Sequence, residues 1–308
     1  MGAPPRLFDA KLWALREPRR RRLAAERAGA DFLLARALED LGDRLAAVRR
    51  PFPAAVDLFS PADRVARALA QSDRFVARLA PAWSAAGEGA QEKGPVVAAS
   101  LDALPLAPAG VDLAVSLLAL QWCEDLPGTL LQIRQALRPD GLFIACVVGG
   151  RTLNELRAAF ARAESEREGG ASPRVIPFAD LRDLGGLLQR AGFALPVTDI
   201  DTVVVRYDTM LDLMADLRAM GAANPLVERG KRFLSRTTLM RAAQIYAEDF
   251  SDPDGRVRAS FDLVWLSGWA PHESQQKPLK PGSAKASLAE ALGTKEVRLS
   301  PNGDGDPA

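Results

Sequence analysis

Residues 111–150 read VDLAVSLLALQWCEDLPGTLLQIRQALRPDGLFIACVVGG, and this stretch decides the fold class. Its first part, VDLAVSLL (111–118), is an apolar run typical of a buried strand. LPGTLLQIRQAL (126–137) has the spacing of an amphipathic helix, and RPDG (138–141) places proline and glycine where that helix would end in a turn. LFIACVVGG (142–150) is apolar on both faces, as a central parallel strand is. The stretch therefore predicts a strand–helix–strand unit with a right-handed crossover.

The same alternation continues toward the N-terminus. Short apolar runs rich in branched residues predict strands, and an amphipathic pattern between them predicts a helix. The predicted elements are strands at 54–58, 74–80 and 94–99, a helix at 62–70 and a loop at 85–94.

Toward the C-terminus the pattern becomes more helical. Two late strands, at 197–207 and 258–269, are separated by helical segments that form an insert at about 208–250. The predicted helices are 152–166, 178–191, 208–220 and 236–249.

The chain therefore divides into three parts. Residues 1–50 form a helical segment, in which apolar spacing predicts a helix from Ala24 to Val48. Residues 51–272 form one α/β domain. Residues 273–308 are rich in Pro, Gly, Ser and Lys, a composition typical of an extended or disordered tail.

Composition excludes several classes of protein. The 308 residues carry a net charge of +1, which gives no general case for nucleic-acid binding. Two cysteines, Cys123 and Cys146, cannot form a disulfide framework or a zinc cluster. No apolar run is long enough to span a membrane, and Asp9 and Glu17 argue against a transit peptide. We therefore expect a cytoplasmic protein with no bound metal.

The N-terminal segment is basic. Residues 1–50 hold 12 Lys and Arg against 7 Asp and Glu, with RRRR at 19–22. One interpretation is a solvated helix face. The other is peripheral contact with anionic lipid at the inner membrane surface or with an acidic protein surface.

Several longer stretches resemble one family. Residues 111–143 look like the fourth strand, following helix and fifth strand of class I S-adenosylmethionine (SAM) dependent methyltransferases. Further stretches are similar to bacterial and mitochondrial relatives of NADH:ubiquinone oxidoreductase complex assembly factor 5. They are LFDAKLWALR (7–16), EREGGASPRVIPF (166–178), LGGLLQRAGF (184–193), MGAANPL (220–226) and GWAPHESQQKPLKPGSAKAS (268–287).

This resemblance covers nearly the whole chain and implies a fold, a cofactor and a partner. The fold is Rossmann-like α/β, a mostly parallel seven-stranded sheet with helices on both faces. The implied cofactor is SAM, and the implied partner is a subunit or assembly intermediate of respiratory complex I. Hydroxylation of an arginine on a complex I subunit is the activity proposed for the mitochondrial member.

The glycine-rich SAM loop that the resemblance implies is altered in this chain. The family form is D-x-G-x-G-x-G, because glycine lets the backbone approach the ligand and take positive φ. Asp57 matches the acid, but Phe59, Pro61 and Asp63 stand at the glycine positions. Pro61 removes an N–H donor, and Asp63 would repel the methionine carboxylate. We expect Ser60 or Asp63 instead to cap the helix that follows.

Two other SAM contacts implied by the family are altered as well. An acid after the second strand would accept hydrogen bonds from the ribose, but Arg78 stands there and has no acceptor. An acid after the third strand would contact the adenine amine. Ser100 occupies that position, with Asp102 as a nearby substitute. The three alterations predict impaired or absent conventional SAM binding.

The candidates for chemistry are few. Gln121 and Trp122 follow a strand at the carboxyl edge of the sheet, where open α/β folds place their sites, although Trp122 could equally cover the core. His272 is the only histidine, and is either a surface residue or a catalytic or partner-binding one. One histidine cannot build a site of two histidines and a carboxylate for non-haem iron.

Three further stretches have two interpretations each. Residues 166–170 (EREGG) form either a helix end with a tight turn or a site or partner loop. Asn224 and Arg229 lie in the helical insert as candidate lid residues. Met and Leu residues at helical spacing form either core or a partner groove, and core is favoured. They are Met210, Leu213, Met214, Leu217 and Met220.

Two functions remain from these observations. The first is a methyltransferase-fold protein without SAM, a pseudoenzyme that helps to assemble complex I by binding a subunit. The alternative is an active SAM-dependent methyltransferase or protein-arginine hydroxylase that modifies a complex I subunit.

Overall fold

The computed structural model describes residues 6–27, 29–71, 74–82, 94–230, 233–276 and 293–294. Contacts divide the chain into two units, Met1–His272 and Glu273–Ala308. The first unit contains all the helices and strands described below. The loop predicted at 85–94 and the tail predicted at 273–308 lie almost entirely outside the described residues.

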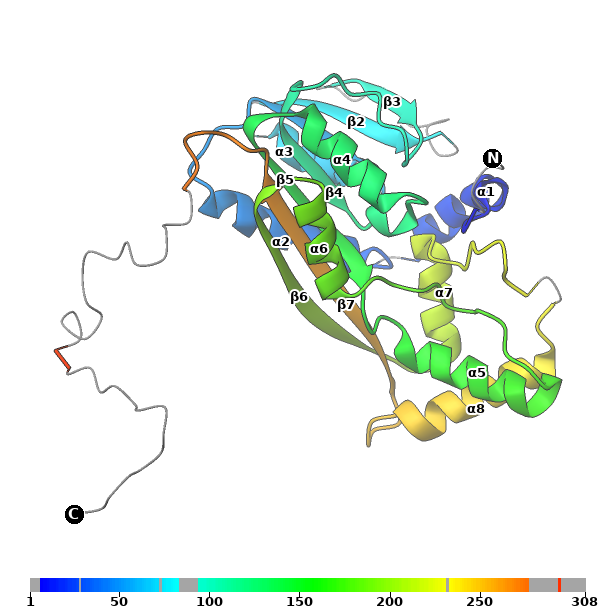
Figure 1. Cartoon of the computed structure of the whole chain (residues 1–308). Helices are drawn as coiled ribbons and strands as arrows, with labels where there is room; N and C mark the ends of the chain where they lie inside the picture. The colour runs from blue at the N-terminus through cyan, green and yellow to red at the C-terminus, as the bar shows by residue number, and fades with distance from the viewer. Residues whose placement is uncertain are drawn as a thin grey trace, which may run out of the picture. The chain divides into compact units, whose positions relative to one another are not determined.

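A seven-stranded sheet forms the centre of the first unit (Figure 1). The strand order is β3-β2-β1-β4-β5-β7-β6, and β7 alone runs in the direction opposite to the other strands. This is the mostly parallel Rossmann-like sheet expected from the sequence. The strands are β1 (Ala54–Leu58), β2 (Phe75–Pro81), β3 (Val96–Ala99), β4 (Val111–Leu117), β5 (Leu137–Gly149), β6 (Ala194–Tyr207) and β7 (Val257–Trp269).

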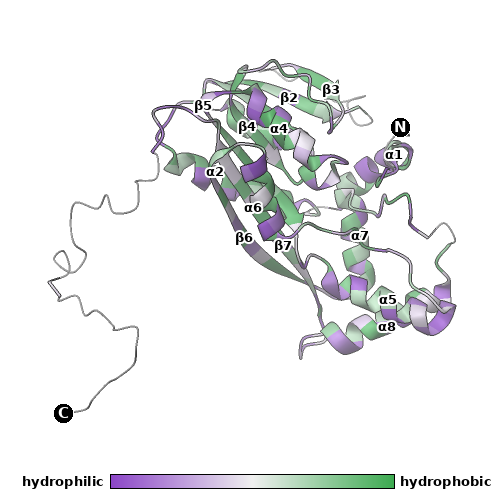
Figure 2. Ribbon diagram, viewed as in Figure 1, coloured by the Kyte–Doolittle hydropathy of each residue, from purple (hydrophilic) through white to green (hydrophobic). Residues whose placement is uncertain are grey.

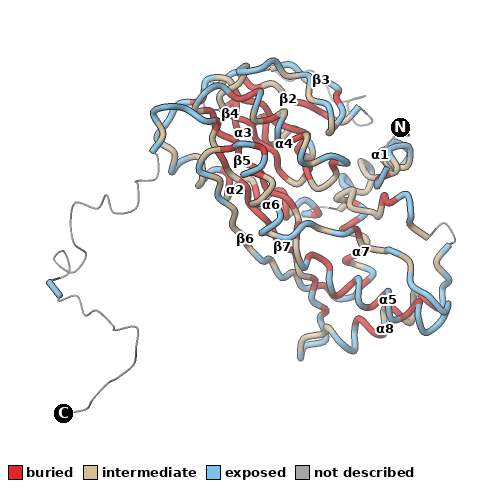
Figure 3. Tube along the Cα trace, viewed as in Figure 1, coloured by how far each residue is buried: buried red, intermediate tan, exposed pale blue. Residues whose placement is uncertain are grey.

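Helices cover both faces of the sheet. Helices α4 and α6 lie over one face, and α2 and α3 pack on the other, each with its own hydrophobic cluster (Figure 1). Apolar residues concentrate along the central strands β4 and β5, as Figure 2 shows, and Figure 3 shows that these strands are largely buried, while the edge strands β3 and β6 are more exposed. The helices are α1 (Ala10–Glu26), α2 (Phe32–Ala47), α3 (Arg64–Ala70), α4 (Leu126–Ala136), α5 (Asn154–Glu168), α6 (Leu181–Arg190), α7 (Met210–Met220) and α8 (Arg236–Phe250).

Strands β6 and β7 extend beyond the rest of the sheet. Strand β5 pairs with β7 only as far as Asp262, while residues 257–261 of β7 continue the ladder with β6 beyond the end of β5. At the branch point the buried Asp262 carboxylate accepts hydrogen bonds from the Arg151 amide and the Thr202 hydroxyl, at 2.7 Å each. The extended ribbon supports α5, α7 and α8, which lie together beside it (Figure 1).

Two predicted boundaries were wrong. The helix expected from Ala24 to Val48 is two helices, α1 and α2, separated by a break in which Gly29 has a φ of +81°. The predicted turn RPDG (138–141) lies inside β5 as a bulge, because the ladder with β4 skips from Leu137 to Leu142. Backbone hydrogen bonds of 3.0 and 2.8 Å to Ala270, just after β7, hold this bulge in the sheet.

Among the described residues, no helix is both long enough and apolar enough to cross a bilayer. The arginines at 19–22 lie on α1, a helix that buries none of its residues. Arg20 and Arg21 pair with Glu17, and Arg22 pairs with Glu26. This arrangement agrees with the solvated-face interpretation. Contact with lipid or an acidic surface stays a prediction.

The EREGG stretch is a helix end followed by a loop that folds back on its own helix. Gly169 caps α5 with a φ of +73°. The buried Glu164 accepts hydrogen bonds from the Ser172 amide at 2.6 Å and from Arg174 Nε at 2.6 Å. Glu168 accepts another from the Thr238 hydroxyl of α8 at 2.8 Å. This geometry favours the helix-end interpretation.

We predict that Glu164→Ala destabilises the fold by about 3 kcal/mol, because it leaves the Arg174 guanidinium partly buried without its carboxylate. The free energy of urea unfolding, followed by circular dichroism, measures the change. Glu166→Ala is the matched control, since Glu166 is on the same helix and pairs with Arg162 and Arg241 at the surface. Equal changes in the two variants would contradict the structural role of Glu164.

Candidate functional site

The carboxyl edge of the parallel strands holds the candidate site. The loop after β1 and the loop after β4 meet there, and a short 3-10 helix (Leu120–Trp122) begins the second loop. Phe59 has a φ of +62°, the left-handed conformation that favours glycine, and its amide donates to the Leu79 carbonyl at 2.9 Å. Its side chain is only 3% exposed and packs in the cluster under α4. The backbone thus keeps a glycine-like turn while a phenyl ring fills the space beside it.

The predicted helix cap was wrong. Asp63 stands at the N-cap position of α3, but its side chain makes no capping hydrogen bond and pairs with Arg67 instead. Ser60 Oγ accepts a hydrogen bond of 2.9 Å from the Leu117 amide, which ties the β1 loop to β4. Ser60 Oγ, which the local pattern predicted to cap the helix, therefore accepts a long-range hydrogen bond instead.

Asp57 and Arg78 form a buried pair. They occupy paired positions of β1 and β2, with Arg78 Nε 3.7 Å from Asp57 Oδ2. The two residues are 0% and 1% exposed. Arg78 Nη2 donates to the Ser60 carbonyl at 3.2 Å, and the Ser60 amide donates to Asp57 Oδ1 at 3.3 Å. The guanidinium therefore faces the acid that the resemblance assigned to the SAM loop.

Burial raises the pKa of Asp57 to about 7, while the hydrogen bonds from Ser60 and the charge of Arg78 act in the opposite direction. The pKa of the Asp57 carboxyl therefore lies close to neutral pH. Such a perturbed carboxyl at the carboxyl edge of the sheet is a feature of functional sites, and also of buried structural ion pairs.

Ser100 and Asp102, the other predicted cofactor contacts, are engaged in local structure. Ser100 Oγ accepts from the Asp102 amide at 3.3 Å. The Asp102 carboxylate accepts from the Glu124 and Asp125 amides at 2.8 and 2.9 Å, so it holds the loop before α4.

Gln121 and Trp122 are brought together at the candidate site, but His272 is not. Trp122 lies edge-on to Phe8 and Trp13, with ring centroids 5.8 and 5.6 Å away. Gln121 donates to the Leu118 carbonyl at 2.8 Å. His272 is exposed beyond the end of β7, which pairs with the start of β5 at the opposite edge of the sheet.

Sequence reasoning missed the N-terminal residues that cover this edge. The Leu7 and Phe8 amides donate to the Glu124 carboxylate at 2.7 and 2.9 Å. Arg16 donates to the Asn224 carbonyl at 2.9 Å. The LFDAKLWALR stretch (7–16) was a signal for this contact, because it carries an aromatic pair outside any apolar helical stripe.

The insert residues named from the sequence also lie here. Asn224 donates to the Pro173 carbonyl at 2.7 Å, and Arg229 pairs with Asp9 at 3.1 Å. These contacts join the insert to the loop after α5 and to the start of α1. Most of the Met and Leu stripe of α7 is core, as favoured. Met210, Leu213 and Leu217 are buried, while Met214 and Met220 line a cavity.

Two cavities adjoin at this edge. The smaller, of about 290 Å³, lies over Phe59, Ser60 and Arg78, where the fold would place a nucleotide. The larger, of about 540 Å³, lies between α2, α5, α7 and the sheet. Both are lined by Pro61, Leu118 and Trp122. In the described ranges, no three His, Cys, Asp or Glu side chains gather as metal ligands.

Known proteins are similar to this chain in sequence. Residues 54–145 match the family model described as a methyltransferase domain. Arginine-hydroxylase NDUFAF5, mitochondrial, of Danio rerio is 40% identical over 263 residues, which cover 84% of this chain and 82% of the relative. The human protein of the same name is 39% identical over 285 residues, 91% of this chain and 80% of the relative.

Solved structures are similar in fold. A methyltransferase-fold protein of Bacillus halodurans has a TM-score of 0.53 at 13% identity, over 76% of this chain and 99% of its own. The YcgJ protein of Bacillus subtilis has a TM-score of 0.52 at 12% identity, with the same shares of the two chains. At these identities the similarity supports the class I methyltransferase fold alone.

We predict that Asp57 makes the fold less stable as the pH rises from about 4 to about 7. The pKa of Asp57 moves from 3.8 to about 7 on folding, so the folded state holds the proton more tightly in this window. The stabilisation is complete below pH 4 and lost as the pH passes 7. Over this range the unfolding free energy of the wild type, minus that of Asp57→Asn, should fall by a few kcal/mol.

The difference between the two proteins isolates Asp57, because asparagine does not titrate and all other groups are shared. Exchange of the protonated carboxyl for an amide adds an offset that does not vary with pH, while the ion pair with Arg78 forms only as Asp57 ionises and is part of the titration. Urea unfolding at half-unit steps of pH measures the two curves. A constant difference would contradict the prediction, since it would mean that Arg78 keeps Asp57 ionised throughout.

Proposed function

The chain belongs to the family of the mitochondrial arginine-hydroxylases NDUFAF5, and from this premise we propose that it is a complex I assembly factor that works without SAM. It would act in the cytoplasm, at or near the inner membrane surface, by binding a complex I subunit. The observation that carries the proposal is the buried Asp57–Arg78 pair, because it places a guanidinium where the methyltransferase fold holds its cofactor.

SAM does not fit the residues at this edge. Phe59 places a buried ring at the first glycine position, and Pro61 has no N–H to offer. Arg78 presents only donors where ribose hydroxyls need an acceptor. The Asp57 carboxylate is already engaged by Ser60 and Arg78. We therefore derive no methyl-transfer step for this chain.

The covering elements support a protein-binding role. Helix α1 buries none of its residues and is held to the insert by Arg16 and to the β4 loop by the amides of Leu7 and Phe8. On the insert, Met240 is 56% and Phe233 103% exposed, so both apolar side chains are available to a partner.

Arginine hydroxylation by this chain is the second candidate, because the relatives carry that name. The charges at the site disfavour it. The smaller cavity is lined by five arginines and one carboxylate, Glu17, which itself pairs with Arg20 and Arg21. A substrate guanidinium would meet repulsion there.

We predict that millimolar SAM leaves the melting temperature unchanged. A ligand at about 100 times its Kd would add about 2.7 kcal/mol of stability, an effect that differential scanning fluorimetry detects easily. S-adenosylhomocysteine is tested in parallel. A clear rise that Asp57→Asn abolishes would contradict the proposal and restore the enzyme interpretation.

We predict that deletion of the gene in its source organism lowers the amount of assembled complex I, measured by native gel and NADH:ubiquinone oxidoreductase activity. The wild-type gene should restore both. Mass spectrometry of the complex I subunits should find no arginine that gains one oxygen atom only when the gene is present. Such a gain would favour the hydroxylase, and unchanged complex I levels would contradict the assembly role.

A further inference from the structure

The larger cavity has apolar walls on the side of the sheet. Its lining there includes Leu33 and Leu34 of α2, Leu156 and Phe160 of α5, and Phe261 of β7. Its volume of about 540 Å³ is within the range of cavities that hold small ligands. Apolar walls of this extent let a ligand bury apolar surface away from water, which stabilises its binding.

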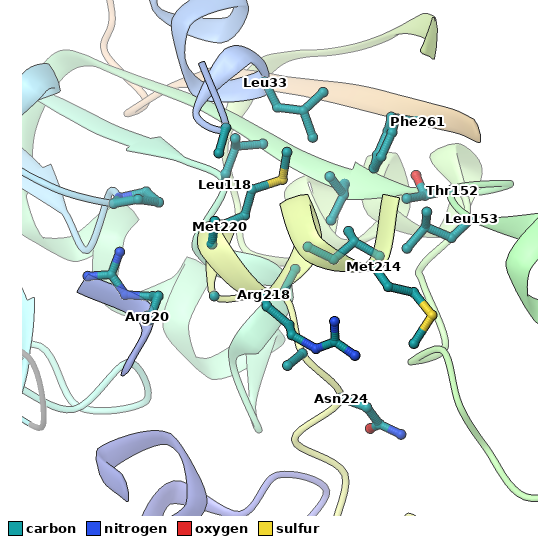
Figure 4. A pocket seen from close by; sticks show the side chains of 18 of the residues that line it. Arg20, Leu33, Leu118, Thr152, Leu153, Met214, Arg218, Met220, Asn224 and Phe261 are labelled. Carbon is teal, nitrogen blue, oxygen red and sulfur yellow. The ribbon is translucent and has the colours of Figure 1, made fainter. Parts of the chain in front are cut away.

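Cationic groups stand at the other side of the cavity. Figure 4 shows Leu33, Leu153 and Phe261 on the side of the sheet, with Arg20 and Arg218 on the opposite side. Arg218 lies in the last turn of α7 and lines both cavities. The smaller cavity, which adjoins here, adds Arg16, Arg19 and Arg78. The apolar chamber thus opens toward a cluster of arginines.

Most of these arginines already form an ion pair with a carboxylate or a hydrogen bond to a carbonyl. Within the described residues, the side chains of Arg218 and Arg19 are the members of the lining that make no such contact. The contacts of the others are Arg20 with Glu17, Arg27 with Asp216, Arg64 with Asp31, Arg174 with Glu164, Arg78 with Asp57, and Arg16 with the Asn224 carbonyl.

One end of the site carries an excess of positive charge, and the other end is apolar. This arrangement is complementary to a molecule with an acidic head group and an apolar chain. We propose that the two adjoining cavities form a binding site for an amphipathic anion, with its acyl chain in the larger cavity and its acidic head group beside Arg218. The head group is a carboxylate or a phosphate, since both accept hydrogen bonds from a guanidinium. This site goes beyond the proposed function and does not require it.

Isothermal titration calorimetry with laurate and with dodecyl phosphate, below their critical micelle concentrations, tests the proposal on the full chain. We expect saturable one-to-one binding of at least one of them. Tighter binding of one anion assigns the head group. Dodecyltrimethylammonium has the same chain with a cationic head, and we expect it to bind at least tenfold more weakly.

Two variants locate the site. Arg218→Glu should weaken binding about fivefold, which corresponds to about 1 kcal/mol. Arg190→Glu is its matched control, because Arg190 is in the last turn of α6, where it carries the same helix-end charge away from both cavities. Met214→Trp should weaken binding about tenfold, because the indole narrows the larger cavity where the acyl chain would lie. Thermal unfolding of each variant verifies that it is folded.

Three results would overturn the proposal. They are the absence of binding by both anions, equal binding of the cationic amphiphile, and equal effects of Arg218→Glu and Arg190→Glu. The outcome is separate from that of the assembly experiment. A folded Arg218→Glu protein that binds laurate more weakly and still fully restores complex I would leave the proposed function intact.

Discussion

The buried pair of Asp57 and Arg78 is the constraint around which the carboxyl edge of the sheet is arranged. A guanidinium does not lose its charge in a protein, so Arg78 can be buried only where acceptors surround it. The Ser60 carbonyl accepts a hydrogen bond from Arg78 Nη2, and the Asp57 carboxylate lies 3.7 Å from Nε as the opposite charge. Ser60 also accepts from the Leu117 amide, so the same loop connects β1, β2 and β4. A change at any of these residues would leave a buried polar group without its partner.

The second constraint lies at Asp262, where β5 ends and β6 and β7 continue as a two-stranded ribbon. Because β6 and β7 continue past the end of β5, the helical insert between them stays close to the carboxyl edge. At this point the carboxylate of Asp262 in β7 accepts hydrogen bonds from the Arg151 amide, just after β5, and from the Thr202 hydroxyl of β6. Helix α7 then lies against α1, and the cavity walls come from segments far apart in the sequence.

The sheet could be predicted because its signals are local. Residues 111–150 carry strand and helix patterns that each extend over a whole element, and β4 and α4 follow them closely, while β5 begins at Leu137, before the predicted start at Leu142. The site depends on contacts between elements. The sequence identified Asp57 and Arg78 separately, but not their pairing. It assigned Ser60 or Asp63 to a helix cap, because a local rule does not include the distant Leu117 amide. No local pattern places Phe59 in a left-handed conformation, since only its burial in the core compensates for that backbone.

The walls of the two cavities come largely from different segments of the chain. Loss of cofactor binding in one cavity therefore leaves ligand binding in the other possible. Phe59, Ser60 and Arg78 line the smaller cavity, so the substitutions that oppose SAM alter that space first. The walls of the larger cavity come mainly from α2, α5, α7 and β7, and of the altered SAM-site positions only Pro61 reaches them. A methyltransferase fold can therefore exchange its nucleotide contacts for a buried ion pair and keep the neighbouring apolar chamber. If that chamber binds an amphipathic anion, its occupancy would order α1 and the insert together, because both contribute to its walls.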